Sequence, residues 1–129
     1  MSEIKAGLGY SEEHEWAEAK SGVIRIGITD YAQHQLGDIV FVEFPEVGAT
    51  LEANQPMGTI ESVKTVSDLF SPVSGTVVKV NEALLDSPEQ VNADPYGEGW
   101  IVEVEVEGDA AEAVAALLTP EQYEAIISR

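Results

Sequence analysis

The sequence contains no cysteine. Without thiols the chain can have no disulfide, no thiolate metal ligand and no cysteine nucleophile. Any thiol chemistry in which this protein takes part therefore needs sulfur from outside the twenty amino acids. Histidine is almost as scarce, because His14 and His34 are the only two. They lie twenty residues apart, with no third ligand at a typical spacing, so we expect no metal site.

Positive charge is also scarce. Six Lys and Arg stand against 24 Asp and Glu, which gives a formal net charge of −18. A surface this acidic repels phosphate backbones and anionic lipids, so we expect neither nucleic-acid nor membrane binding, and it favours partners that carry basic patches. The sequence has no long apolar run, and residues 1–9 lack the pattern of a signal or transit peptide, so we expect a cytoplasmic protein.

The length and composition are those of one globular domain, which we place at residues 1–129. Most of this domain favours strand. Alternating, β-branched or aromatic residues between turn signals predict strands at 23–28, 39–44, 58–63, 65–70, 76–80 and 100–107. Many short strands at close spacing predict a mainly β domain, either a sandwich or a barrel.

Helix signals are confined to the margins of this pattern. Thr29 is expected to cap a short helix over 31–36, with Gly37 as its stop. The C-terminal residues, at about 110–128, are also expected to be helical. There we expect two helices, the first over 110–118 and the second, capped by Thr119, running through Ile127.

Lys64 is one of only four lysines, and its surroundings are symmetrical. Pro56 and Pro72 each lie eight residues from it and bound segments that favour strand. This pattern predicts a hairpin over about 56–72, with Lys64 at or near its tip. A lysine in a turn is ordinarily a solvated surface group, and the composition leaves this interpretation open. A hairpin tip would, however, hold the amine rigid and accessible, as a modifying enzyme requires.

Three motifs surround this lysine: Glu61, Ser62, Val63 and Lys64, then Ser67 and Asp68, then SPVSG at 71–75. Together they resemble the lipoyl-attachment signature of the H proteins of the glycine cleavage system. Further motifs similar to that family occur in the same order over roughly residues 10–107, namely HEW at 14–16, GITD at 27–30, LGDIV at 36–40, PEVG at 45–48 and PYGEGW at 95–100. Biotin carriers typically flank their lysine with methionines, and lipoyl domains of 2-oxo acid dehydrogenases place an Asp before it. Neither pattern is present here.

The resemblance implies a barrel–sandwich hybrid of two small antiparallel sheets, with short peripheral helices and a C-terminal helix. It implies that lipoate is joined to Lys64 through an amide, within the lipoylation motif Glu61, Ser62 and Val63. The protein would then be a non-catalytic shuttle. Its lipoyl group would carry an aminomethyl group from glycine decarboxylase, a pyridoxal phosphate (PLP) enzyme, to the tetrahydrofolate-dependent aminomethyltransferase, and dihydrolipoamide dehydrogenase would reoxidise it. Lipoate-attaching enzymes are further implied partners, and we expect a monomer.

Two acids are candidates for holding the loaded arm. The aminomethyl group carries a primary amine, and folding the arm into a groove would exclude water and prevent loss of the carbon. For the acceptor of this amine, the resemblance suggests Glu15, and the position four residues past Lys64 suggests Asp68. Two simpler interpretations remain: both acids are solvated, and the HEW run at 14–16 is a half-buried aromatic between polar neighbours.

Two other functions remain open. A small enzyme could use Glu15, His14 or Asp68 as an acid–base group, although no nucleophile or cofactor motif accompanies them. Alternatively, the protein could relay lipoyl groups to other acceptors, and the sequence does not separate this role from that of the shuttle. Activity with the decarboxylase and the aminomethyltransferase would separate the two.

Overall fold

The computed structural model describes residues 2–128, so Met1 and Arg129, the two ends of the predicted domain, lie outside the described residues. The strands are β1 (Gly9–Tyr10), β2 (Glu15–Lys20), β3 (Val23–Ile28), β4 (Ile39–Glu43), β5 (Thr50–Leu51), β6 (Pro56–Ser62), β7 (Val66–Phe70), β8 (Gly75–Val80) and β9 (Val102–Glu105). The helices are α1 (Asp30–Leu36), α2 (Ala83–Asp86), α3 (Gln90–Ala93), α4 (Ala110–Ala115) and α5 (Pro120–Ile127).

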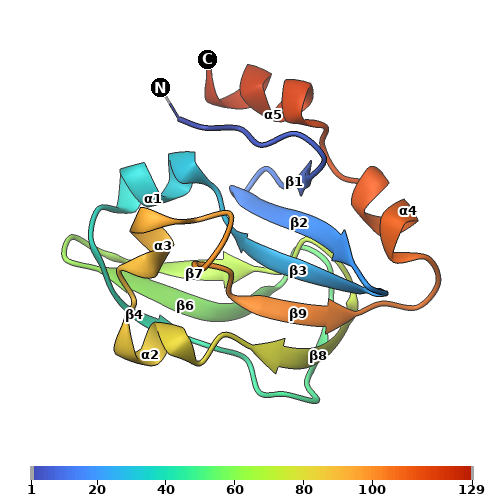
Figure 1. Cartoon of the computed structure of the whole chain (residues 1–129), viewed down its shortest axis with the longest axis horizontal. Coiled ribbons are helices and arrows are strands. Elements are labelled where there is room, and N and C mark those ends of the chain that lie inside the picture. Colours follow the sequence, from blue (N-terminus) through green and yellow to red (C-terminus); the bar gives the residue numbers. More distant parts are fainter. Residues whose placement is uncertain (1, 129) are drawn as a thin grey trace.

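The strands form two antiparallel sheets. The larger has the order β1-β2-β3-β9-β8-β5 and the smaller the order β4-β6-β7. Figure 1 shows the strands at the centre of the molecule and the helices around their rim. Apolar residues of both sheets share one buried core, including Ile26 and Val104 of the larger sheet and Val42 and Ile60 of the smaller. The prediction of a mainly β fold, with two antiparallel sheets and peripheral helices, is therefore confirmed.

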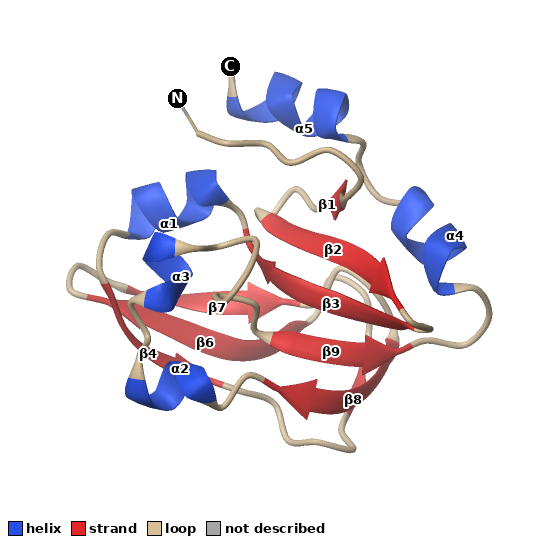
Figure 2. Ribbon diagram, in the orientation of Figure 1, coloured by secondary structure: helices blue, strands red, loops and turns tan. Residues whose placement is uncertain are grey.

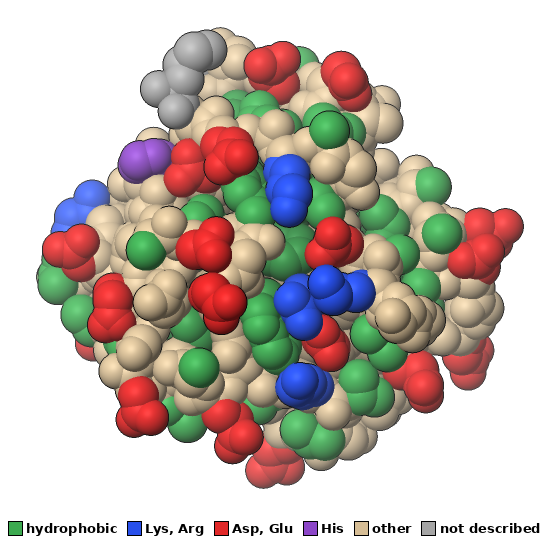
Figure 3. Space-filling view, in the orientation of Figure 1, with side chains coloured by type: hydrophobic (Ala, Val, Ile, Leu, Met, Phe, Trp, Pro, Cys, Tyr) green, Lys and Arg blue, Asp and Glu red, His purple; other side chains and the backbone are tan. Residues whose placement is uncertain are grey.

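Alternation along the strands decides which residues enter this core. Ile24 and Val104 are register partners on β3 and β9, and both are fully buried. The next pair, Arg25 and Glu103, lies on the outer face, where Arg25 Nε donates to the Glu103 carboxylate at 2.9 Å. The guanidinium also lies over the ring of Trp100, 4.6 Å from its centroid. Figure 3 shows several basic side chains near the centre of this view, with acids between them.

The predicted helix caps are confirmed. Thr29 Oγ1 accepts from the backbone N–H of Ala32 at 3.2 Å and so begins α1. Gly37 ends that helix with a φ of 83°, a left-handed conformation that favours glycine. At the start of α5, Thr119 accepts from the backbone N–H of Gln122 at 3.1 Å, and the Gln122 side chain completes a capping box.

The first C-terminal helix is shorter than predicted. The sequence predicts a helix over 110–118, but α4 ends at Ala115. The chain then leaves the helix to pair with β1, where Leu118 N donates to Tyr10 O at 2.9 Å and Tyr10 N donates to Leu118 O at 3.0 Å. Leu118 therefore forms hydrogen bonds with the edge strand β1 instead of continuing the helix.

Other differences from the prediction involve short or atypical elements. The last strand is β9, Val102–Glu105, rather than 100–107, because Trp100 N donates to the carbonyl of Gly97 at 3.1 Å and so belongs to the preceding turn. The sequence did not predict β1, β5, α2 and α3, which are two to four residues long and too short to show a period. It also did not predict β2.

The HEW run at 14–16 is more buried than we expected. Trp16 is fully buried and Glu15 is 2% exposed, so the interpretation of a half-buried aromatic between polar neighbours is wrong. Trp16 Nε1 donates to the carbonyl of Pro95 at 3.0 Å. Its ring lies against its register partner Gly27, where an added Cβ would come within 2.7 Å of the indole. This close approach requires glycine.

Replacing Gly27 by Ala should therefore lower the free energy of unfolding by about 1–3 kcal/mol, the usual cost of overpacking a core. The new carbon would meet Cε2, Cζ2 and Nε1 of Trp16. Phenylalanine lacks the fused two-ring system to which these atoms belong. Gly27→Ala should consequently cost less when Trp16 is already Phe. Urea unfolding of both single variants and the double variant measures this coupling, and a value below about 0.5 kcal/mol would show that the indole does not exclude alanine.

Candidate functional site

Lys64 lies at the tip of the β6–β7 hairpin, as the sequence predicts. After an irregularity between Pro56 and Gly58, the two strands pair in register up to Glu61 and Val66. Ser62 closes the turn between them, because its hydroxyl accepts from Lys64 N at 3.1 Å and from Thr65 N at 3.2 Å. Lys64 itself is exposed. The serine of the predicted lipoylation motif thus shapes the turn that presents the lysine.

The hairpin tip rests on the end of α1. Val63 N donates to the carbonyl of Asp38 at 3.0 Å, which ties the turn to the segment after the helix. The lysine stem lies over Gly37, where an added Cβ would come within 3.2 Å of Lys64 Cε. Glycine at this position therefore leaves room for the lysine stem to lie across the end of the helix.

A cavity of about 280 Å³ begins beside this contact. We call it the α1–β7 cavity, since α1, the loop before β2 and the strand β7 supply most of its wall. It is lined by Glu13, His14, Glu15, Ile28, Tyr31, Ala32, Gln35, Leu36, Ile60, Ser67, Asp68 and Leu69. Leu36 directly precedes Gly37, so the cavity adjoins the glycine over which the lysine stem lies.

Glu15 contributes a buried carboxyl group to this cavity. Its Oε1 accepts from the Ser11 hydroxyl at 2.6 Å, and its Oε2 accepts from the backbone N–H of Phe70 at 3.3 Å. Burial raises the pKa of Glu15 to about 8, with a smaller contribution from the nearby charge of Glu13, and the two hydrogen bonds act in the opposite direction. Glu15 therefore holds its proton through most of the neutral range, and it is not a solvated surface acid.

Asp68 lines the same cavity from β7, and unlike Glu15 it is exposed. The structure thus brings the two predicted acids to one cavity, from different sheets. Glu61 does not join them: it lies opposite Phe41 and Val66 on the exposed face of the small sheet. Phe41 and Val66 are 48% and 61% exposed, so an apolar surface lies beside the hairpin tip.

The sequence did not assign His14 to this cavity. Its Nδ1 lies 2.9 Å from the hydroxyl of Tyr123, which comes from α5. Burial lowers the pKa of His14, and the nearby charge of Glu13 partly opposes this shift. His34, by contrast, is exposed and pairs with Asp30 at 3.5 Å. Within residues 2–128, no three His, Asp or Glu side chains come together so that they could hold a metal ion.

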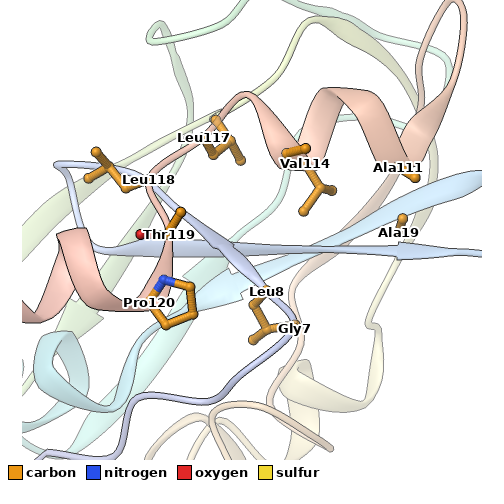
Figure 4. Close-up of a pocket in the computed structure, with 10 residues that line it drawn as sticks. Gly7, Leu8, Ala19, Ala111, Val114, Leu117, Leu118, Thr119 and Pro120 are labelled. Carbon is orange, nitrogen blue, oxygen red and sulfur yellow. The ribbon is translucent and has the colours of Figure 1, made fainter.

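A second cavity has a mainly apolar wall. It has a volume of about 300 Å³ and lies between α4 and the start of the chain, where apolar side chains such as Leu8, Val114 and Leu117 line it (Figure 4). No titratable side chain contributes to its wall. In Figure 1, α4 lies at the opposite end of the molecule from the β6–β7 turn. Separately, none of the helices described between residues 2 and 128 has the length and hydrophobicity of a membrane span.

Comparison with known proteins identifies the family. The model of the family described as "Glycine cleavage H-protein" matches residues 8–129. The "Glycine cleavage system H protein" of Geobacillus kaustophilus is 59% identical over 121 residues, which are 94% of each chain. That of Bacillus cytotoxicus is 62% identical over 116 residues, or 90% of each chain.

A solved structure agrees with these sequence matches. The crystal structure of a glycine cleavage system H protein from Mycobacterium marinum superimposes with a TM-score of 0.88 at 40% identity, and the match covers 98% of this chain and 100% of that one. Proteins with this name are carrier components of the glycine cleavage system, so the alternative of a small acid–base enzyme is set aside. The chain therefore belongs to the glycine cleavage H-protein family, and it is a carrier component rather than an enzyme.

Proposed function

We propose that this chain carries lipoate in amide linkage to Lys64 and holds the loaded arm in the α1–β7 cavity. The observation that carries the proposal is the position of Lys64, which is exposed at a rigid turn and lies against Gly37 beside that cavity. A bound lipoyl group would supply the thiol–disulfide chemistry that a chain without cysteine lacks.

The residues present fit such a group. The missing Cβ of Gly37 leaves a cradle for the lysine stem, and the adjoining cavity, at about 280 Å³, is close to the lower limit of about 300 Å³ for small-molecule sites. Its wall combines apolar side chains, including Ile28, Leu36 and Leu69, with three carboxyl groups, those of Glu13, Glu15 and Asp68. Apolar walls exclude water from a bound cargo, and the carboxyl groups can accept from a primary amine.

Glu15 and Asp68 take this acceptor role in the proposal. A cationic amine next to Glu15 favours its carboxylate, so Glu15 releases its proton to solvent as the cargo enters. A charge-assisted hydrogen bond stabilises the closed arm by about 1.5–3 kcal/mol, or a factor of roughly 10–150 over the open arm. The chain's own contribution is then to present the lysine, retain the cargo and keep water away from it.

The proposed partners are the enzymes that the sequence analysis implies. The PLP-dependent glycine decarboxylase loads the aminomethyl cargo, the tetrahydrofolate-dependent aminomethyltransferase removes it, and dihydrolipoamide dehydrogenase restores the disulfide. Lipoate-attaching enzymes act before all three. The net charge of −18 favours basic patches on these enzymes, and Val63, which is 67% exposed, gives them an apolar contact directly beside Lys64.

Lys64→Arg should abolish attachment of lipoate, because a guanidinium does not serve as the acylated amine. Lys79→Arg is the matched control, since Lys79 is also exposed but lies over Trp100 on the large sheet. Intact-mass measurement after incubation with a lipoate-attaching enzyme, lipoate and ATP should show full modification of the control and none of Lys64→Arg. Lipoate mapped to Lys5, Lys20 or Lys79 in the unaltered chain would contradict the proposal.

The double variant Glu15→Gln with Asp68→Asn should lose its cargo faster, by a factor of up to about 10–150, since neither amide carries the charge that holds the amine. The rate is measured on purified loaded protein without partner enzymes. Glu105→Gln with Glu107→Gln removes the same charge from exposed positions outside the cavity and should leave the rate unchanged. An unaltered rate in the first variant would mean that the cavity retains the cargo by shape alone or not at all.

Glu15→Gln should also change how stability depends on pH. Between the ordinary pKa of 4.5 and the folded-state value of about 8, the folded chain binds more protons at Glu15 than the unfolded chain, so wild-type stability falls as pH rises. Glutamine has no such dependence. From pH 4.5 to 8.5, the free energy of unfolding of the variant should therefore rise relative to that of the wild type, by an amount on the order of a few kcal/mol. Denaturant unfolding measures this difference. A constant difference over this range would refute a raised pKa.

A further inference from the structure

Tyr123 is fully buried although it lies in the last helix of the chain. Its ring stacks on that of Tyr10, with centroids 4.7 Å apart and planes 7° from parallel. Figure 2 shows α5 beside the N-terminal segment and β1. The helix therefore docks on the large sheet through this ring, and it places the hydroxyl group of Tyr123 close to the α1–β7 cavity.

That hydroxyl connects two polar groups from different parts of the chain. It lies 2.7 Å from Thr29 Oγ1 and 2.9 Å from His14 Nδ1. Thr29 is fully buried, and its Oγ1 already accepts from the N–H of Ala32. If Thr29 also accepted from Tyr123, its own hydroxyl proton would have no partner among residues 2–128. Buried polar hydrogens are nearly always bonded. Thr29 therefore donates to the Tyr123 hydroxyl, which in turn donates to His14 Nδ1.

This order determines the tautomer of the histidine. Tyr123 donates to Nδ1, so Nδ1 of a neutral His14 carries no proton and Nε2 does. Burial lowers the pKa of His14, which keeps the ring neutral near pH 7. The tilted contact with Tyr31, at 5.0 Å between centroids, holds the ring from a second side, and Tyr31 also lines the cavity.

The backbone at His14 needs this support. Its φ is 70°, in the left-handed region that side chains other than glycine rarely adopt. Such a residue persists where its surroundings over-determine it, and here His14 O accepts from Thr29 N at 3.0 Å while His14 N donates to Ser11 O at 3.1 Å. The residue after this reversal is Glu15, so the conformation of His14 sets the entry of Glu15 into the cavity.

We propose that Tyr123 is a positioning residue for the α1–β7 cavity: its hydroxyl fixes His14 as the Nε2–H tautomer and thereby holds the wall that carries Glu15. The proposal rests on the proposed function only where it concerns cargo, since the tautomer is a property of the unloaded chain. It also assigns a purpose to the C-terminal helix, which is remote from the hairpin in sequence but bonded to the cavity wall.

The test compares Tyr123→Phe with Tyr10→Phe. The two rings stack on each other and each variant loses one hydroxyl, but the Tyr10 hydroxyl donates to the carbonyl of Lys5 and forms no hydrogen bond with a cavity residue among residues 2–128. Imidazole ¹⁵N shifts of the unloaded proteins, with His34 as internal reference, should show a bare Nδ1 in the wild type and in Tyr10→Phe. Tyr123→Phe should show averaged shifts of the two tautomers. Thr29→Ser keeps the donor and should retain the wild-type pattern.

The second measurement is cargo loss from the loaded proteins without partners. Tyr123→Phe should lose its cargo about two- to tenfold faster, the range expected for one neutral hydrogen bond, and Tyr10→Phe should match the wild type. A proton on Nδ1 in the wild type, or unchanged shifts in Tyr123→Phe, would overturn the proposal. If Tyr123→Phe altered the ¹⁵N shifts of His14 but left the rate of cargo loss unchanged, the positioning role would be overturned. Failure of the proposed function is distinct, because it would appear as absence of lipoate on Lys64 in all variants.

Discussion

A carboxyl group buried without a basic partner is the constraint on which the site depends. Glu15 is 2% exposed, and its partners are the hydroxyl of Ser11 and the N–H of Phe70, neither of which carries a charge. An unpaired buried carboxylate is costly, so the group keeps its proton and its pKa rises to about 8. Stability alone would favour a residue that cannot ionise at this position. A retained carboxyl is consistent with a ligand that brings the missing positive charge.

The remaining structure keeps that carboxyl in place. The register of β2 on β3 sets Trp16 against Gly27, and strand alternation then turns the neighbouring Glu15 to the opposite side. There the N–H of Phe70 binds it, which joins the large sheet to β7 of the small one. The cavity therefore lies where the two sheets meet, and α1 covers one side of it. The hairpin tip contacts the segment that ends the same helix through Val63, so presentation of the lysine and the proposed retention of cargo both depend on α1.

Features that depend on near neighbours could be predicted from the sequence. The cap at Thr29 and the hairpin around Lys64 are of this kind, because three to eight residues contain the whole signal. The cavity is different. Its wall comes from segments that meet only in the folded chain, and the contact between His14 and Tyr123 spans 109 residues. The burial of Trp16 likewise depends on distant groups, and the early end of α4 depends on pairing with β1. The family motifs identified Glu15, but they did not indicate its burial.

The scarcity of cations and the unpaired Glu15 can be understood together. A Lys or Arg in the cavity wall would pair with Glu15 and lower its pKa, but it would then compete with the amine of the cargo. No lining residue is Lys or Arg, while Arg25 lies over Trp100 on the outer face of the large sheet. Lys64 lies beside the cavity, and the proposed acylation would remove its charge. The site would then hold acids without a cationic partner, and the proposed loaded amine would be the cation that Glu15 meets.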